Sequence, residues 1–111
     1  MAQYYTGLDV SMDRTDITIV DERGRIVFES FATTDPSSID TILKNAGFPI
    51  TKMSLESGSW SHWLIRELTE LGWNITCIDA RSIAPLLALK TNKTDRNDAR
   101  GIAEAVRAES Q

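Results

Sequence analysis

Four acidic residues occupy positions from which their carboxylates could act together: Asp9, Glu56, Asp95 and Asp98. Asp95 and Asp98 are three residues apart, so on a helix they would share one face. Carboxylates that converge raise one another's pKa, and Mg²⁺ relieves that repulsion because it prefers oxygen ligands. Two such ions about 3.5–4 Å apart can activate an attacking oxygen and stabilise a leaving one in phosphodiester cleavage. If the four side chains converge, they indicate phosphoryl transfer on a polynucleotide.

The first third of the chain is predicted to form three antiparallel strands, at residues 4–10, 15–21 and 26–31. Within the second of these, Ile17 and Ile19 alternate with Asp16 and Thr18, which is the period of a half-buried strand. Gly24 suits the tight turn between the second and third strands, because glycine readily adopts positive φ.

Helical and extended patterns alternate in the remainder. The predicted elements are a helix between Asp35 and Gly47, a strand at residues 51–55, a helix between Ser59 and Gly72, a strand at residues 74–78, a helix around residues 82–89 and a final helix after Thr94. Thr94 is the predicted N-cap of the last helix, which would put Asp95 and Asp98 in its first turns. Cys77 alternates with its strand neighbours and is predicted to lie in the core.

This order of elements predicts an α/β fold with a mixed five-stranded sheet flanked by helices. Right-handed crossovers put strands four and five beside strand one, in the order 3-2-1-4-5, which is the ribonuclease H-like arrangement. Asp9 then lies at the carboxyl end of strand one, and Glu56 immediately follows the parallel strand four. Both would emerge at one edge of the sheet, where open α/β sheets bind ligands. Taken singly, each acid has a simpler interpretation as a turn, cap or solvated loop residue.

Composition is that of one globular domain spanning all 111 residues, with 41% hydrophobic and 25% charged side chains. The formal net charge is -4, yet residues 81–100 are locally basic. Lys93, Arg96 and Arg100 flank the last two acids and are candidates for nucleic-acid phosphate contacts, although ordinary solvated helix charges explain them equally well. No apolar run approaches the roughly 18 residues of a membrane span, and the N-terminus lacks signal-peptide features. With a single cysteine, these features favour the cytoplasm.

Four short sequence motifs resemble those of a known protein family. They are Gly7-Leu8-Asp9-Val10-Ser11, Leu55-Glu56-Ser57-Gly58, Cys77-Ile78-Asp79-Ala80-Arg81 and Asn92-Lys93-Thr94-Asp95-Arg96-Asn97-Asp98-Ala99. In this order they resemble the N-terminal, RuvC-like domain of the DEDD transposases of the insertion sequence 110 family, which are related to the Piv site-specific invertases. The last of these motifs is the most specific for the family. Met12 departs from the pattern, because relatives often carry lysine there, and this puts one phosphate contact in doubt.

The resemblance implies a metal-dependent activity that cleaves and rejoins DNA strands in transposition or site-specific inversion. By position, Asp9, Glu56, Asp95 and Asp98 correspond to the catalytic acids that bind Mg²⁺ or Mn²⁺, with two ions expected. The family also implies a second, C-terminal domain with a serine that attacks DNA, a guide RNA in some members, and a homo-oligomer at full length. We expect that second domain to be absent from residues 1–111.

Three alternatives remain open at this stage. A Holliday-junction resolvase-like nuclease would share the fold and the acids. A catalytically inactive, truncated interaction module would keep the site without its activity. A fragment of an actin-like ATPase or sugar kinase would begin with the same strands, but Asp9-Val10-Ser11-Met12 lacks the glycine of the phosphate loop in those enzymes.

Overall fold

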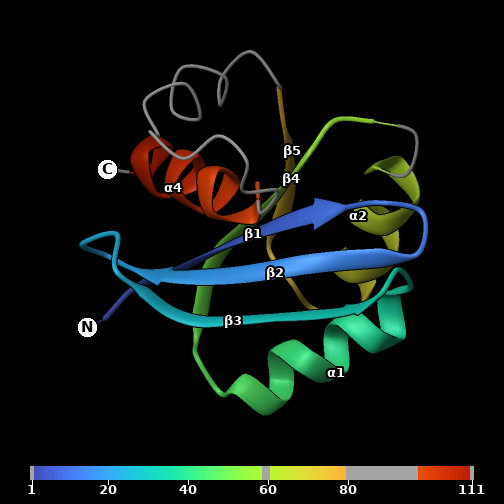
Figure 1. Ribbon diagram of the computed structural model, residues 1–111, viewed down its shortest axis with the longest axis horizontal. Helices are drawn as coiled ribbons and strands as arrows, with labels where there is room; N and C mark the ends of the chain where they lie inside the picture. The colour runs from blue at the N-terminus through green and yellow to red at the C-terminus, as the bar shows by residue number, and fades with distance from the viewer. Residues whose placement is uncertain (1, 59–60, 80–97, 111) are drawn as a thin grey trace.

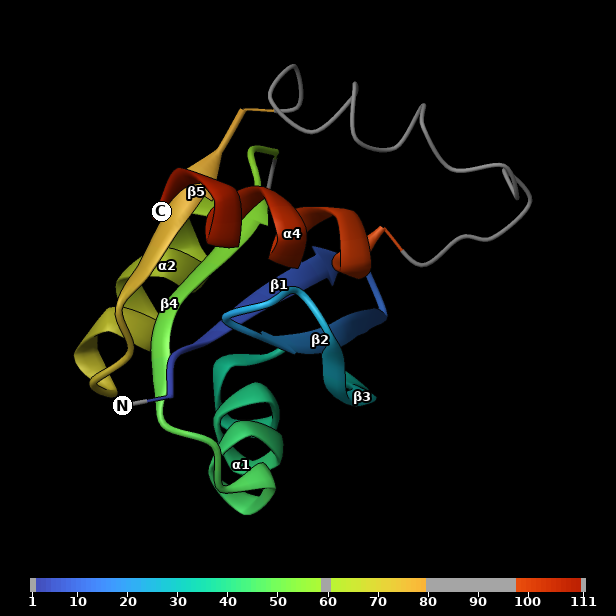
Figure 2. The same cartoon turned by 90° about the vertical axis from the view of Figure 1, so that its left-hand side faces the viewer.

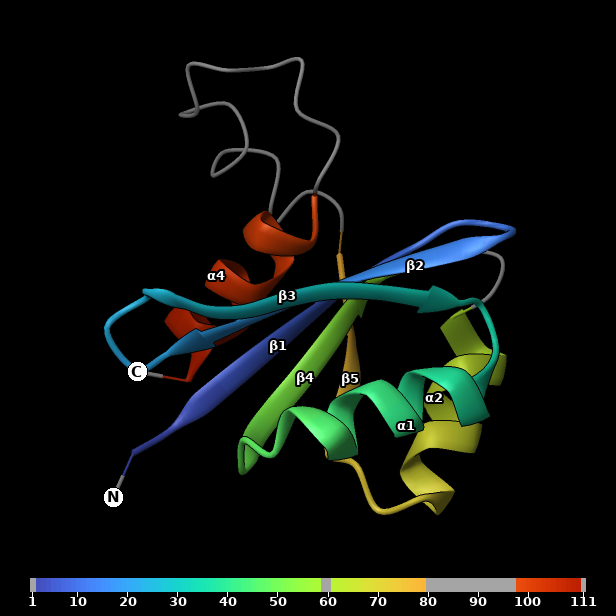
Figure 3. The ribbon, with the colours of Figure 1, turned by 60° about the horizontal axis from the view of Figure 1, so that its bottom comes forward.

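A computed structural model of the chain describes residues 2–58, 61–79 and 98–110. Within these residues five strands form one mixed sheet in the order β3-β2-β1-β4-β5, as predicted (Figures 1 and 3). The strands are β1 (Tyr4–Val10), β2 (Arg14–Asp21), β3 (Ile26–Thr33), β4 (Ile50–Glu56) and β5 (Ile75–Ile78). Central β1 pairs antiparallel with β2 and parallel with β4. The carboxyl ends of β1 and β4 therefore lie side by side.

The described helices cover opposite faces of this sheet. The helices α1 (Pro36–Ala46) and α2 (Ser61–Glu70) lie on one face, and α4 (Ala99–Glu109) lies across the other (Figure 2). The predicted helix around residues 82–89 lies outside the described residues. In the part of the chain that the structure describes, no helix is long and apolar enough to cross a membrane.

Alternation along β1 assigns each of its side chains to one of these two faces. Leu8 belongs to the main core, which packs beneath α1 and α2. Tyr5, on the opposite face, packs with Ala103 and Val106 of α4. Because successive side chains of a strand point to opposite faces, Asp9 shares the α4 face with Tyr5.

Local sequence signals explain how α1 is bounded. Asp35 is its N-cap, and its carboxylate accepts a hydrogen bond from the backbone N–H of Ser38 at 2.8 Å. Pro36 occupies the first helical position, where its missing N–H costs nothing. Gly47 ends the helix at φ 80°, a left-handed conformation that favours glycine. These boundaries confirm the prediction from the sequence.

Gly7 allows α4 to rest directly on β1. A β-carbon at Gly7 would lie 2.3 Å from the carbonyl oxygen of Ala99 and 2.4 Å from the backbone nitrogen of Ala103. Any larger residue at this position would therefore push the helix away from the sheet. The close approach brings the N-terminal end of α4 to the carboxyl end of β1.

Cys77 corrects one prediction, because it is exposed and not part of the core. It belongs to β5, which within the described residues forms an edge of the sheet and pairs only with β4. The alternating pattern sets which side of the sheet a residue faces, but it does not say whether another element covers that side at an edge strand.

Candidate functional site

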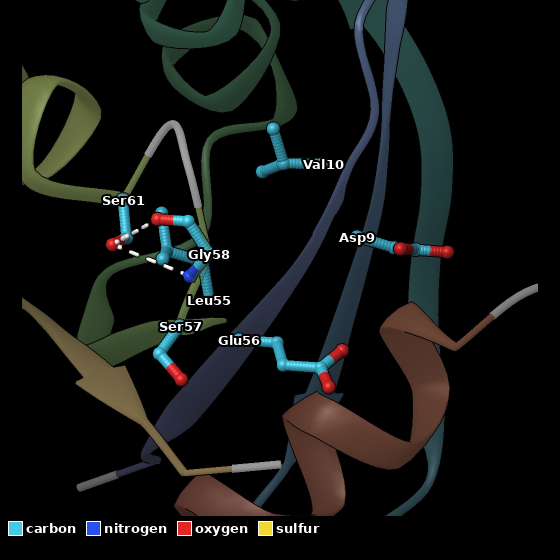
Figure 4. A pocket seen from close by; sticks show the side chains of 7 residues that line it. All are labelled: Asp9, Val10, Leu55, Glu56, Ser57, Gly58 and Ser61. Carbon is cyan, nitrogen blue, oxygen red and sulfur yellow. Dashed lines mark hydrogen bonds between the residues drawn. The ribbon is translucent and has the colours of Figure 1, made fainter.

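Asp9 and Glu56 lie next to each other at the carboxyl edge of the sheet. The preceding residues, Leu8 of β1 and Leu55 of β4, are partners in the parallel register and both belong to the core under α1 and α2. The residues that follow them point to the opposite face, which α4 covers. Both carboxylates therefore leave the sheet on the side of α4, and Figure 4 shows Glu56 pointing toward that helix.

A small cleft lies at the carboxyl ends of these two strands. Its volume is about 140 Å³, and its lining consists of Asp9, Val10, Leu55, Glu56, Ser57, Gly58 and Ser61 (Figure 4). The hydroxyl of Ser61 donates to the carbonyl oxygen of Gly58 at 2.9 Å and accepts from the Gly58 N–H at 3.4 Å. These bonds join the end of β4 to the start of α2 and leave one wall of the cleft polar.

Asp98, at the start of α4, lies close to Asp9 but does not line the cleft. It occupies the N-cap position of the helix, with φ -72° and ψ -11°, and its side chain makes no capping hydrogen bond. Its backbone N–H donates to the carboxylate of Asp9. An N-cap aspartate normally uses its carboxylate to accept from the first helical turn, so this carboxylate is not committed to that role. The prediction that Asp98 lies within the first turns is corrected, because the described helix begins at Ala99.

The environment raises the pKa of the Asp9 carboxyl from 3.8 to about 6. Burial is the largest cause, and the negative charge of Asp98 is the next. The hydrogen bond from the Asp98 backbone opposes the shift, while the charges of Asp16 and Glu56 add to it. Burial and the neighbouring negative charges thus both disfavour ionised Asp9, and a bound cation would offset both effects.

Asp16 is a member of this acidic group that sequence reasoning missed. It lies opposite Asp9 in the antiparallel register of β1 and β2. Its carboxylate pairs with the guanidinium of Arg14 at 2.9 Å, which partly neutralises it. The signal was present in the sequence, because a short hairpin between residues 10 and 14 fixes which residues face each other.

The described carboxylates fit a hard divalent cation in chemistry but do not form a complete ligand set. No group of three or more His, Cys, Asp or Glu within residues 2–58, 61–79 and 98–110 is arranged to hold a metal ion. Asp9, Glu56 and Asp98 interact through their charges, which is the relation a shared cation requires. Asp95, the fourth predicted acid, lies outside the described residues.

Comparison with known proteins places this chain in a family. The model of the DEDD transposase family of insertion sequence 110, described as a transposase, matches residues 6–111. The chain belongs to this transposase family. No curated protein matches it in sequence. Family membership supports a function in DNA cleavage and transposition in general, and it confirms the family resemblance of the four sequence motifs.

Solved structures confirm the fold of this transposase chain. RuvC from Thermus thermophilus superposes with a TM-score of 0.61 at 12% identity, covering 97% of this chain and 96% of that one. A ROK family glucokinase from Streptomyces griseus superposes with a TM-score of 0.55 at 14% identity, covering 86% of this chain and 39% of that one. At such identities the likeness shows the fold alone, which is RuvC-like and ribonuclease H-like.

Of the three residues predicted to bind phosphate in the transposase chain, the structure describes Arg100. Lys93 and Arg96 lie outside the described residues. Arg100, in the first turn of α4, donates from Nε and Nη2 to the two carboxylate oxygens of Glu29, each at 2.7 Å. Its guanidinium is thus engaged within the fold, a role that the sequence did not indicate.

Proposed function

We propose that this chain carries the carboxylates of a metal-dependent site that cleaves and rejoins DNA strands in transposition or site-specific inversion. The observation that carries the proposal is the grouping of Asp9, Glu56 and Asp98 at the carboxyl edge of β1 and β4, where burial first and then the neighbouring negative charges raise the pKa of Asp9. Acids that only stabilised the fold would be expected to have cationic partners. Among the described residues, no ion pair joins Asp9 or Glu56 to a basic side chain.

In this proposal Asp9, Glu56, Asp95 and Asp98 are the ligands of Mg²⁺ or Mn²⁺, with two ions bound. Metal ions in such sites lower the pKa of an attacking hydroxyl and stabilise the charge on the leaving oxygen. The protein contributes by holding the carboxylates in place. Rigid β1 and β4 hold Asp9 and Glu56, and contact with Gly7 holds the helix that carries Asp98.

DNA is the proposed substrate, and basic side chains beside the acids would contact its phosphates. Lys93 and Arg96 remain proposals for that role. Arg100 would have to leave Glu29 or share its guanidinium to take part. At full length we expect a second domain that carries a serine nucleophile, a homo-oligomer, a guide RNA in the manner of some family members, and action in the cytoplasm.

A Holliday-junction resolvase-like activity is the second candidate, favoured by the superposition on RuvC along almost the whole chain. The two activities differ in substrate. One would act on the ends of a mobile element or an inversion site, and the other on four-way junctions. A sugar-kinase-like function has less support, because the chain covers only 39% of the glucokinase and the segment after Asp9 has no phosphate-loop glycine.

The test is strand cleavage and rejoining by a full-length protein that contains this chain. Asp9→Asn, Glu56→Gln and Asp98→Asn should each abolish product in Mg²⁺ while the variants stay folded. Glu70→Gln, an exposed change at the end of α2, is the matched control and should keep full activity. Wild-type product from the three site variants would remove those residues from the site. Cleavage of four-way junctions in place of element ends would favour the resolvase.

A further inference from the structure

Arg100 and Glu29 connect two elements that lie far apart in the sequence. Arg100 belongs to the first turn of α4, and Glu29 lies in the edge strand β3, a separation of 71 residues. Two parallel N–H···O bonds of 2.7 Å join the guanidinium to both oxygens of the carboxylate. Such bidentate pairs fix orientation as well as distance.

The same carboxylate is also held by the sheet beneath it. Oε2 of Glu29 accepts a hydrogen bond of 2.9 Å from the hydroxyl of Thr18, its direct partner in the pairing of β2 with β3. Thr18 is fully buried, so its hydroxyl has a fixed position. We call Thr18, Glu29 and Arg100 the Glu29 latch, because together they fasten the start of α4 to the sheet.

The latch acts two residues away from Asp98. Asp98 makes no capping hydrogen bond with its own side chain, and the first helical bond runs from the N–H of Ile102 to the carbonyl oxygen of Asp98 at 3.0 Å. Gly7 sets how closely α4 approaches β1, and the buried side chains of α4 hold the helix on the sheet. The latch adds a directional polar contact at the end of the helix that carries the acid.

We propose that Glu29 is a positioning residue that, through Arg100, holds Asp98 beside Asp9 in the geometry needed for cation binding. This inference rests on the proposed function, because it assigns Asp98 to a metal site. Glu29 does not bind the cation itself.

Partial exposure of the latch separates this role from simple stabilisation of the fold. The side chain of Arg100 is 39% exposed and that of Glu29 is 28% exposed. Partly exposed ion pairs make small contributions to the free energy of unfolding, and a bidentate arginine–carboxylate pair lies at the upper end of these contributions. A residue that only added stability would therefore leave cation affinity unchanged, whereas a positioning residue changes affinity much more than stability.

The experiment compares Glu29→Gln with Glu109→Gln in this 111-residue chain. Glu109 pairs with Lys52 of β4 at 3.8 Å, so its replacement breaks a similar contact between the sheet and the opposite end of α4. Binding of Mn²⁺ is measured from the electron paramagnetic resonance signal of the free ion, and thermal unfolding is measured without metal. Glu29→Gln should weaken Mn²⁺ binding about tenfold or more, as loss of a residue that orients a ligand typically does. Glu109→Gln should leave the affinity unchanged, and both variants should unfold near the wild-type temperature.

A second readout needs no metal. In the metal-free chain, exchange of the Ile102 amide hydrogen reports opening of the first turn of α4, and Glu29→Gln should accelerate it while Glu109→Gln should not. Thr18→Val should have a weaker effect in the same direction, and Thr18→Ser, which keeps the hydroxyl, should restore wild-type exchange.

The outcomes distinguish failure of the latch from failure of the proposed function. Equal Mn²⁺ affinity in Glu29→Gln and Glu109→Gln, together with unchanged Ile102 exchange, would overturn the latch even if Asp9→Asn abolishes binding. If the wild type binds no Mn²⁺ that depends on Asp9, the metal site itself is wrong, and with it the role of Glu29 in cation binding.

Discussion

The backbone N–H of Asp98, at the start of α4, donates a hydrogen bond to the carboxylate of Asp9, at the end of β1, although their side chains carry charge of the same sign. The hydrogen bond favours the ionised form of Asp9, whereas burial and the negative charge of Asp98 favour the protonated form. The second pair of effects is larger, so the pKa of Asp9 is raised. The start of the helix is thus held against an acid that its own side chain repels. A bound divalent cation would remove this conflict by binding both carboxylates.

This conflict predicts how stability depends on pH. The pKa of Asp9 is about 6 in the folded chain against 3.8 for the ordinary carboxyl, so the folded state binds the proton more tightly. The stability contributed by this group is therefore fully present below about pH 4 and is lost as the pH rises through about 6. The loss should amount to about 1–2 kcal/mol, reduced from the full shift because Asp9 is only partly buried.

Asp9→Asn isolates this effect, because asparagine has no charge to desolvate. At pH 7, without metal, the variant should be more stable than the wild type, and the difference should vanish near pH 4. Urea unfolding in the presence of a chelator, at several pH values, measures it. If the variant is less stable than the wild type at pH 7, the carboxylate is not the destabilising group described above.

Gly7→Ala tests the contact between α4 and β1. The new β-carbon would clash with the backbone at Ala99 and Ala103, so α4 must shift away from the sheet. Overpacking of this kind costs about 1–3 kcal/mol. Thermal unfolding measures the loss, and Gly58→Ala is the control, because its β-carbon would have no neighbour closer than 4.0 Å. Equal stability of the two variants would show that α4 does not rest on Gly7.

Thr6→Val should stabilise the chain. The hydroxyl of Thr6 is buried in β1, and in the part of the chain that the structure describes it has no hydrogen-bond partner. Valine has the same shape without the unsatisfied group, so the gain should be about 1 kcal/mol or more. Thr15→Val is the matched control, because the buried hydroxyl of Thr15 bonds that of Thr34 at 2.9 Å. It should lower the unfolding free energy. A loss of stability in both variants would indicate that Thr6 has a partner.

The sequence predicted the parts of the fold that depend on local patterns. These patterns involve residues close together in the chain: the alternation of apolar and polar residues in strands, the glycines at turns and the Asp35-Pro36 start of α1. The preference for right-handed crossovers then predicted the strand order. That order placed Asp9 and Glu56 at one edge, where the structure has them. What the sequence did not predict depends on contacts between distant segments. The pair of Glu29 and Arg100 joins residues 71 positions apart, and no periodicity indicates which of several arginines an acid will meet.

The central claim is tested most directly by titration with Mg²⁺ and Mn²⁺ followed by thermal unfolding. The proteins compared are the wild type, Asp9→Asn and the control Glu70→Gln. A cation that binds only the folded state stabilises it by about 2.7 kcal/mol at a concentration one hundred times its dissociation constant. We predict a rise in unfolding temperature with metal for the wild type and the control, and none for Asp9→Asn. No rise at millimolar metal, or the same rise in all three proteins, would contradict a carboxylate metal site built on Asp9.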